Sequence, residues 1–208
     1  RTFAEENREL LKKWSDYLVE NGYDPGNQLC TDDFAGHSEH NCNLSVKAIL
    51  AIAAYGKLFD DYKYLEIAKE YAARWQKEAA NDKGTKLAFN NDESWSLKYN
   101  IVWDILLDIN IFDKEVLEKE IKLYLSKMNR YGVPLDCRSD YTKADWQIWT
   151  TVMCDNKEYR DRIIDAMYDF VNDTNDRTPF PDWYYTSDCR REFFQNRTVL
   201  GGIYINLL

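Results

Sequence analysis

The sequence lacks the excess of basic residues that nucleic acids and anionic membranes attract. It has 27 Lys and Arg against 36 Asp and Glu, which gives a formal net charge of −9. Both kinds of partner bind clustered cationic side chains, so this balance argues against them. An uninterrupted run of 18 or more apolar residues, the length that spans a bilayer, is also absent. We therefore expect a small-molecule substrate, with no nucleic acid and no membrane as partner.

The sequence also lacks the common motifs for metals, nucleotides and reactive nucleophiles. It contains no C-x-x-C pair, no P-loop, no dinucleotide-binding fingerprint and no G-x-S-x-G turn. Its only two histidines, His37 and His40, are spaced H-x-x-H rather than H-E-x-x-H, and no third ligand accompanies them. These absences predict no metal and no cofactor, with the histidines on a polar rim.

The cysteines are odd in number, at positions 30, 42, 137, 154 and 189. An odd count fits a reducing compartment better than a complete set of disulfides, which favours the cytoplasm. Cys30 and Cys42 nevertheless flank one segment and could form a disulfide in an exported protein. The compartment therefore stays open.

Helical periodicity runs through most of the chain, and alternating strand patterns are scarce. The length of 208 residues and the hydrophobic content of 45% suffice for one domain with a large core. We predict eight helices, at residues 3–20, 43–58, 62–80, 95–110, 113–128, 144–154, 157–171 and 198–207.

Charged residues alternate between these helices. The first, third, fifth and seventh are amphipathic: in the third, Leu65, Ala72 and Trp75 share one face. The others are apolar nearly all round, as in "NLSVKAILAIAAYGKL" and "TVLGGIYINLL". Because a helix that is apolar on every side must be buried on every side, the pattern predicts an outer helix followed by an inner helix, four times over.

The connections between the helices alternate as well. Those from an inner to the next outer helix are very short, at 59–61, 111–112 and 155–156. Those from an outer to the next inner helix are long, at 21–42, 81–94, 129–143 and 172–197. Helices in such hairpins run antiparallel, so all four long connections should emerge at one end, beside the N-termini of the inner helices. The pattern predicts an all-α fold, an α/α toroid of about four helical hairpins in an incomplete ring.

Several segments resemble the six-hairpin domain of the glutaminase A-type family. They are "TDDFAG", "NLSVKAILAIAAYGKL", "WSLKYNIVWDILLDINIF", "YGVPLDCRSDYTKADWQIWT" and "PDWYYTSD…VLGG", which together cover nearly the whole chain. The resemblance implies a six-hairpin toroid, a glutamine-hydrolysing activity as in the fungal members, and a possible secreted location. The family also includes many bacterial relatives.

With four hairpins, residues 1–208 resemble the C-terminal part of that toroid, a single domain of a larger multidomain protein. The start at Arg1 rather than Met fits this expectation. An incomplete ring would expose inner-helix surface. We therefore expect missing N-terminal domains of the same protein, or a second copy of the chain, as partners.

Two adjacent carboxylates in the first long connection, Asp32 and Asp33, are the first catalytic candidates. Neighbouring carboxylates in a confined site repel each other, which raises the pKa of one and suits it to proton transfer. The alternative is that one caps a turn and the other is solvated. Asn43, at the start of the second helix, is interpreted first as an N-cap and second as a ligand for a substrate amide or carboxylate.

The third long connection adds Asp136 and Arg138, which should pair with each other or with neighbouring connections. Asp145 follows on an inner helix that is otherwise uncharged, and Trp146 lies beside it. Thr142 and Asp145 could form a capping box. Alternatively, a lone carboxylate among aromatic rings is a candidate acid with a raised pKa, which makes Asp145 the third catalytic candidate.

The last long connection carries Asp182, Trp183 and Arg197. Asp182 could cap a turn, and Trp183 could stack on a sugar, line a pocket or seal the mouth of the toroid. Arg197 precedes the uncharged final helix and could hold a substrate carboxylate together with the N–H groups of that helix.

These residues leave three functions open. The first is a hydrolase of the glutaminase A type, in which Asp32, Asp33 or Asp145 activates water while Arg138 or Arg197 and Asn43 hold the substrate. The second is a glycoside hydrolase that uses paired carboxylates and aromatic platforms. The third is a non-catalytic fragment or a ligand-binding module.

Overall fold

The structure is a computed structural model that describes residues 2–153 and 155–208. The α-helices of this part are α1 (Thr2–Glu6), α2 (Arg8–Asn21), α3 (Cys42–Phe59), α4 (Tyr62–Glu78), α5 (Val102–Leu106), α6 (Lys114–Lys127), α7 (Ala144–Trp149) and α8 (Lys157–Asp173). Short 3-10 helices are η1 (Asp33–Ala35), η2 (Tyr99–Ile101), η3 (Thr150–Val152) and η4 (Thr198–Leu207). The strands are β1 (Gln28–Leu29), β2 (His37–Ser38), β3 (Tyr141–Lys143) and β4 (Trp183–Tyr185).

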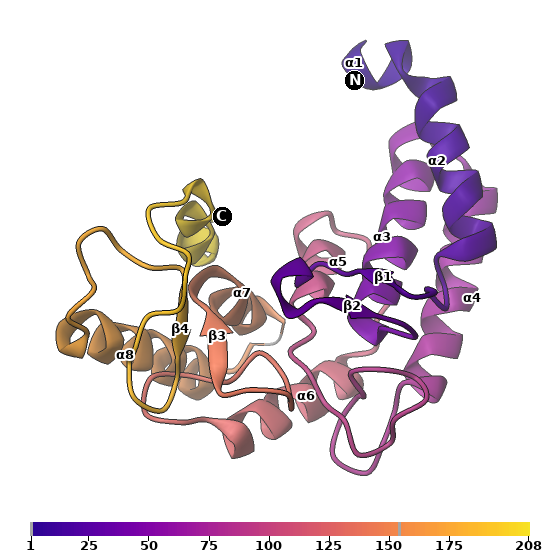
Figure 1. The fold of residues 1–208 in the computed structure, drawn as a ribbon. Coiled ribbons are helices and arrows are strands. Elements are labelled where there is room, and N and C mark those ends of the chain that lie inside the picture. Colours follow the sequence, from indigo (N-terminus) through magenta and orange to yellow (C-terminus); the bar gives the residue numbers. More distant parts are fainter. Residues whose placement is uncertain (1, 154) are drawn as a thin grey trace.

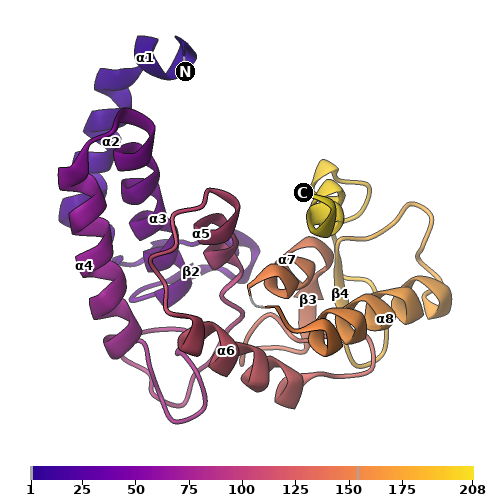
Figure 2. The same cartoon turned by 180° about the vertical axis from the view of Figure 1, so that it is seen from behind.

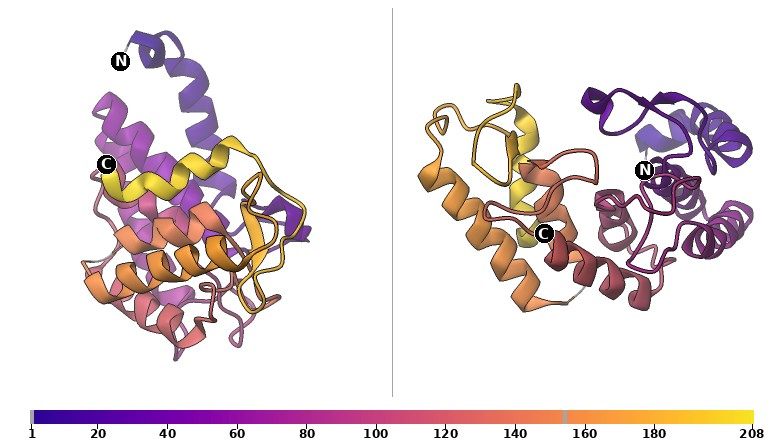
Figure 3. Two further views of the ribbon diagram at one scale, coloured as in Figure 1. Left: turned by 90° about the vertical axis from the view of Figure 1, so that its left-hand side faces the viewer. Right: turned by 60° about the horizontal axis from the view of Figure 1, so that its bottom comes forward.

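The helices follow one another along an open arc (Figure 1), which Figure 2 shows from behind. The right-hand view of Figure 3 shows α2, α3 and α4 at one end of the arc and α8 with η4 at the other. α3 packs against both α2 and α4, and α7 packs against α8 and η4. The arrangement confirms the predicted alternation of outer and inner helices and the all-α toroid that does not close.

α3 is the longest inner helix, and its boundaries follow from its end residues. The side chain of Asn41 accepts the N–H of Leu44 at 2.8 Å, so Asn41 is the N-cap and the cap predicted at Asn43 is wrong. Asp60, in the left-handed conformation with φ 53°, ends the helix. By length and composition alone α3 could cross a membrane, but 61% of it is buried inside the fold, and core helices share these properties.

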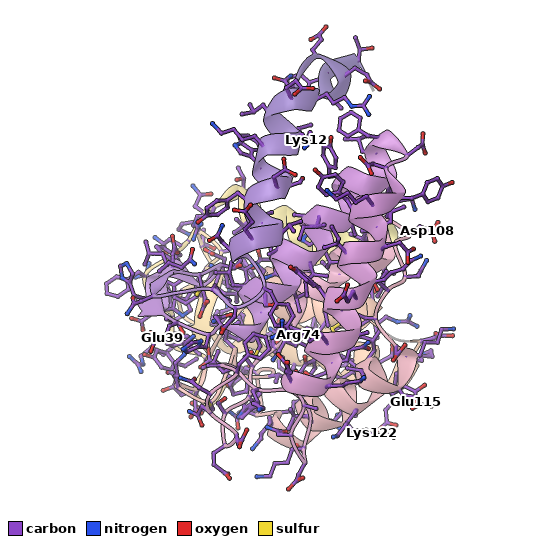
Figure 4. The ribbon with its side chains drawn as sticks, turned by 90° about the vertical axis from the view of Figure 1, so that its right-hand side faces the viewer. Lys12, Glu39, Arg74, Asp108, Glu115 and Lys122 are labelled. Atoms are coloured by element: carbon purple, nitrogen blue, oxygen red, sulfur yellow. The ribbon has the colours of Figure 1, made fainter. Side chains whose placement is uncertain are left out.

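The outer helices carry the charge that α3 lacks. Figure 4 shows Lys12 on α2, Arg74 on α4 and Lys122 on α6 at the outer surface. On α4 the buried residues are Tyr64, Ala68, Ala72 and Trp75, which recur every three or four positions and turn one face toward α3. The indole N–H of Trp75 donates to the carbonyl of Cys42 at 2.9 Å, which fixes the outer helix to the start of the inner one.

The second and third inner helices are shorter than predicted. Within 95–110 only η2 and α5 are helical, and the described part of 144–154 divides into α7 and η3. The N–H of Leu97 donates to the carbonyl of Leu135 at 2.8 Å instead of to its own chain segment. Pairing between neighbouring connections therefore uses backbone groups that a longer helix would need.

The four long connections meet at one rim, and each pairs with the next. The first and second pair at Asn41↔Ala88, the second and third at Ser96↔Asp136, and the third and fourth through β3 and β4, from Tyr141↔Tyr185 to Lys143↔Trp183. The rim lies beside the starts of α3, η2 and α7, which directly follow these pairs in the chain. The predicted gathering of the long connections at one end is thus confirmed.

The final helix differs from the prediction that uncharged helices are buried on every side. η4 packs on α7 through Gly202, where a Cβ atom would lie 3.0 Å from Cβ of Asp145. Its other face is open: Tyr204 is 62% exposed and Leu207 is 81% exposed. The expectation that further hairpins or a second copy cover such a surface stays a prediction.

One backbone position near the rim should be intolerant of any side chain. Gly132 has φ +125°, and a Cβ atom there would lie 2.2 Å from Oε1 of Gln147, which is itself hydrogen-bonded to the N–H of Val133. We expect Gly132→Ala to lower the free energy of unfolding by about 2–4 kcal/mol, from backbone strain and steric overlap. Urea denaturation measures this loss. Gly26→Ala is the control, because nothing lies within 4 Å of its added Cβ, and an equal loss in both variants would contradict the prediction.

Candidate functional site

Asp32, Asp136 and Arg138, here called the Arg138 cluster, are brought together from the first and third long connections. The Nε–H of Arg138 donates to Oδ1 of Asp136 at 2.9 Å, and Nη2 donates to Oδ2 of Asp136 at 2.6 Å. Nη2 also pairs with the carboxylate of Asp32, 106 residues away in the chain. The predicted pairing of Asp136 and Arg138 with each other is confirmed, and Arg138 also pairs with Asp32 of the first connection.

The guanidinium of Arg138 is fixed but not saturated. The backbone N–H of Arg138 donates to Oδ1 of Asp136 at 2.8 Å, so a local turn sets the side chain against its carboxylate. Burial lowers the pKa of Arg138, but Asp136 and Asp32 raise it, and the net pKa lies above the ordinary value. The side chain is 30% exposed, and Nη1 makes no hydrogen bond to the described residues. Its two N–H groups are therefore available to an anion.

Asn43 and Tyr99 close the inner side of this cluster. Oδ1 of Asn43 accepts the N–H of Asn100 at 3.4 Å, which joins the start of α3 to η2. Burial and the nearby carboxylate of Asp32 raise the pKa of Tyr99 well above its usual range, so its phenol is neutral. The cavity between Asp32, Asp136 and Tyr99 measures only about 10 Å³. This cavity is too small for a ligand, so a ligand must approach Arg138 from the side of the guanidinium that is exposed to solvent.

Lys143, Asp145, Asp182 and Arg197 are here called the Lys143 cluster. Lys143 ends β3, Asp145 lies in α7, and Asp182 and Arg197 directly precede β4 and η4. The carbonyl of Asp182 accepts the N–H of Ala144 at 2.8 Å, which anchors the first residue of α7. The ammonium of Lys143 pairs with the carboxylate of Asp182, and Nη1 of Arg197 lies 3.4 Å from the same oxygen. Lys143 and Asp182 are both buried.

Asp145 has the electrostatic character of an acid/base group. It is 2% exposed, and burial raises the pKa of its carboxyl group to about 6. The charge of Lys143 and the backbone N–H groups of Asp145 and Trp146 oppose that rise, and Asp182 adds to it. Oδ1 of Asp145 and Oδ1 of Asp182 are buried without a hydrogen bond to the described residues. Such oxygens favour a ligand or substrate group that donates hydrogen bonds.

A set of aromatic rings joins the two clusters, and Phe34 is at its centre. The ring centroid of Phe34, two residues after Asp32, lies 6.0 Å from that of Trp146 and 4.4 Å from that of Trp183. These two rings belong to the residues that follow Asp145 and Asp182. Trp146 also stacks on Tyr99 at 4.2 Å. The first connection, α7 and the fourth connection therefore contribute to one aromatic wall that lies beside both clusters.

Most of the residues predicted from sequence belong to this assembly. Asp32, Asn43, Asp136, Arg138, Asp145, Trp146, Asp182, Trp183 and Arg197 all lie in one cluster, in the wall or beside them. Asp33 lies apart, exposed at the start of η1, and its role stays a prediction. The capping box at Thr142 is wrong, because Thr142 is in β3 opposite Tyr184 and Lys143 precedes α7. Asp182 pairs with Lys143 instead of capping a turn, and Trp183 is buried.

Sequence reasoning missed Phe34, Tyr99 and Lys143. Lys143 had a signal, since it is a second charge only two residues before Asp145 in an otherwise uncharged stretch. Phe34 and Tyr99 had none, because hydrophobic residues beside a helix start are usually ordinary core.

Among the described residues, no histidine or cysteine side chain forms a hydrogen bond or an ion pair with either cluster. Nδ1 of His40 lies 2.8 Å from Asp24, and His37 is exposed. In the described part of the chain, no three His, Cys, Asp or Glu residues are grouped as a metal ion would need. Cys30 and Cys42 are free thiols, and burial raises their pKa values to about 11 and about 12. Cys154 lies outside the described residues.

Comparison with known proteins places this geometry in context. Residues 1–207 match the family model described as the glutaminase A six helical-hairpin domain. The chain is 35% identical to "Glutaminase A" of Aspergillus oryzae over 96% of its length, and 31% identical to "Probable glutaminase/05536" of Arthroderma benhamiae over 97%. It covers 31% of the first relative and 28% of the second, so it spans about a third of their length.

Proposed function

The chain belongs to the glutaminase A six-helical-hairpin family, and from this premise we propose that it carries the hydrolytic site of a glutaminase. In the proposed reaction, water attacks the side-chain amide of glutamine, and glutamate and ammonia are released. The alternative of a glycoside hydrolase keeps its paired carboxylates and aromatic wall, but the two relatives described above are named as glutaminases. Sugar release therefore becomes an outcome of the test rather than a second proposal.

The observation that carries the proposal is the buried carboxyl group of Asp145 at the start of α7, which has one oxygen without a hydrogen bond to the described residues. A carboxyl group with a pKa of about 6 is largely ionised at neutral pH, yet it is basic enough to accept a proton. Asp145 is therefore the general base: it takes a proton from the attacking water and returns it to the departing nitrogen. Asp32 is less suited to this task, because its carboxylate is committed to Arg138.

Arg138 supplies the complementary function of holding the substrate. Nη1 makes no hydrogen bond to the described residues, whereas Nε and Nη2 of the same guanidinium are held by two carboxylates. An α-carboxylate of glutamine would receive two charge-assisted hydrogen bonds there. Asn43 supports this arrangement from behind by holding η2 and, through it, the ring of Tyr99. The aromatic wall beside both clusters then limits the access of solvent to the reacting amide.

Ammonia release measured against pH tests the proposal. Because Asp145 acts in its ionised form, kcat/KM for glutamine should rise with pH around 6 and level off above pH 7. Coupled glutamate dehydrogenase reports the ammonia, and a panel of aryl glycosides is assayed beside it. Release of sugar without ammonia would overturn the glutaminase assignment and favour a glycoside hydrolase. Ammonia release that falls through the same pH range would exclude a carboxylate base.

A further inference from the structure

Lys143 is buried in a position where a lysine is costly. Its ammonium lies over three rings, 5.6 Å from the centroid of Phe34, 5.7 Å from Trp146 and 5.1 Å from Phe194. The side chain is 3% exposed, and its partner Asp182 is fully buried. A buried ion pair of this kind is seldom worth more to stability than apolar side chains of the same volume. Because stability does not account for the pair of Lys143 and Asp182, we look for a functional role of this pair beside Asp145.

The charges that face Asp145 can be assigned element by element. β3 contributes the cation of Lys143. The fourth connection contributes the anion of Asp182, which directly precedes β4. Arg197 acts at one remove, through Asp182. η4 packs on Asp145 without any charged residue, and η2 contributes the neutral ring of Tyr99 against Trp146. The ionisation of Asp145 thus depends on two opposing neighbours, one cation and one anion.

We propose that Lys143 is a positioning residue of the hydrolytic site, which keeps Asp145 ionised, and that Asp182 orients Lys143 while opposing its electrostatic effect. This inference rests on the proposed function of Asp145 as the base. A positive charge held next to Asp145 stabilises its carboxylate, and a negative charge destabilises it. The burial of Asp145, Lys143 and Asp182 strengthens both effects, because a low-dielectric surrounding screens them little.

The two neighbours therefore have effects of opposite sign, which a purely structural role would not have. Lys143→Met removes the cation, so the acid limb of the kcat/KM profile should move up by about one pH unit, with about a fivefold loss of activity at pH 6. Asp182→Asn removes the anion, so the limb should move down by about half a unit. Lys143→Arg keeps the charge, and its limb should stay near that of the unchanged protein.

A matched control and a second readout complete the test. Lys98→Met removes another fully buried lysine, one whose ammonium bonds to Ser96, and should leave the acid limb in place. The carboxyl pKa of Asp145 is also followed directly by ¹³C NMR of aspartate-labelled protein, with the Asp145→Asn spectrum identifying its signal. Both readouts should shift in the same direction for each variant.

The outcomes separate this inference from the proposed function. Without ammonia release from glutamine, opposite NMR shifts would still support the coupling of Lys143 and Asp182 to Asp145 while the glutaminase assignment fails. With ammonia release, the inference would be overturned if the acid limbs of Lys143→Met and Asp182→Asn lay at the same pH, or if both shifted in the same direction. If Lys143→Met does not fold, Asp182→Asn and Lys143→Arg decide the question. The inference is supported if the acid limb moves to lower pH in Asp182→Asn and stays in place in Lys143→Arg. Any other combination of the two results overturns it.

Discussion

Ammonia release from glutamine is expected to fall about a thousandfold when Asp145 is replaced by Asn, because the site then lacks the group that accepts the proton of the attacking water. The substitution keeps the size of the side chain and its capacity to accept the N–H groups at the start of α7. KM should change little, since Arg138 still holds the α-carboxylate. Initial rates at saturating glutamine measure the loss in kcat.

A matched control distinguishes loss of the base from loss of the fold. Asp104 is also 2% exposed, and burial raises the pKa of its carboxyl group too. Its oxygens accept the N–H groups of Ile111 and Phe112 at 3.1 and 3.2 Å, away from the rim. Asp104→Asn should lower stability in urea and leave kcat of the folded protein within about threefold. Comparable loss of kcat in both variants would mean that Asp145 acts through stability, not as the base.

The sequence predicts the architecture well where periodicity and charge carry the information. α3 is apolar on all sides and lies inside, whereas α2, α4, α6 and α8 carry the charge and lie outside. The lengths of the connections then predict their common rim. The same reasoning fails for the second and third inner helices, because bonds such as Leu97 to Leu135 form between connections far apart in the chain. No local pattern records such pairing.

Some residues of the candidate site could likewise be predicted from the sequence, and others could not. Asp145 could be found because it is a charge in an uncharged helix, a local feature. The pairing of Lys143 with Asp182 could not be predicted, because it depends on the antiparallel register of β3 and β4. These two strands show too little alternation of polar and apolar residues to be recognised in the sequence. Phe34 reaches Trp146 and Trp183 only after three connections have come together. Residues that act across connections therefore need coordinates, whereas isolated charges do not.

Replacement of Arg138 by Lys is expected to raise KM for glutamine about 10- to 100-fold while kcat stays within about threefold. Lysine keeps the positive charge that Asp32 and Asp136 need, which avoids two unpaired buried carboxylates. It loses the planar fork, and with it the two Nη1–H groups proposed to hold the α-carboxylate. The loss corresponds to about 1.5–3 kcal/mol of charge-assisted hydrogen bonding. An interaction made equally in ground and transition states appears in KM and not in kcat.

A substrate without the α-carboxylate provides the decisive comparison for Arg138. The α-methyl ester of glutamine cannot use the Nη1 contact, so the unchanged protein and Arg138→Lys should hydrolyse its side-chain amide with the same kcat/KM. Arg130→Lys is the matched control, because Arg130 also pairs with a carboxylate, Asp173, but is 65% exposed and lies outside both clusters. If Arg138→Lys impairs the ester as much as glutamine, Arg138 does not bind the α-carboxylate, and its contact with Asp32 serves to shape the rim.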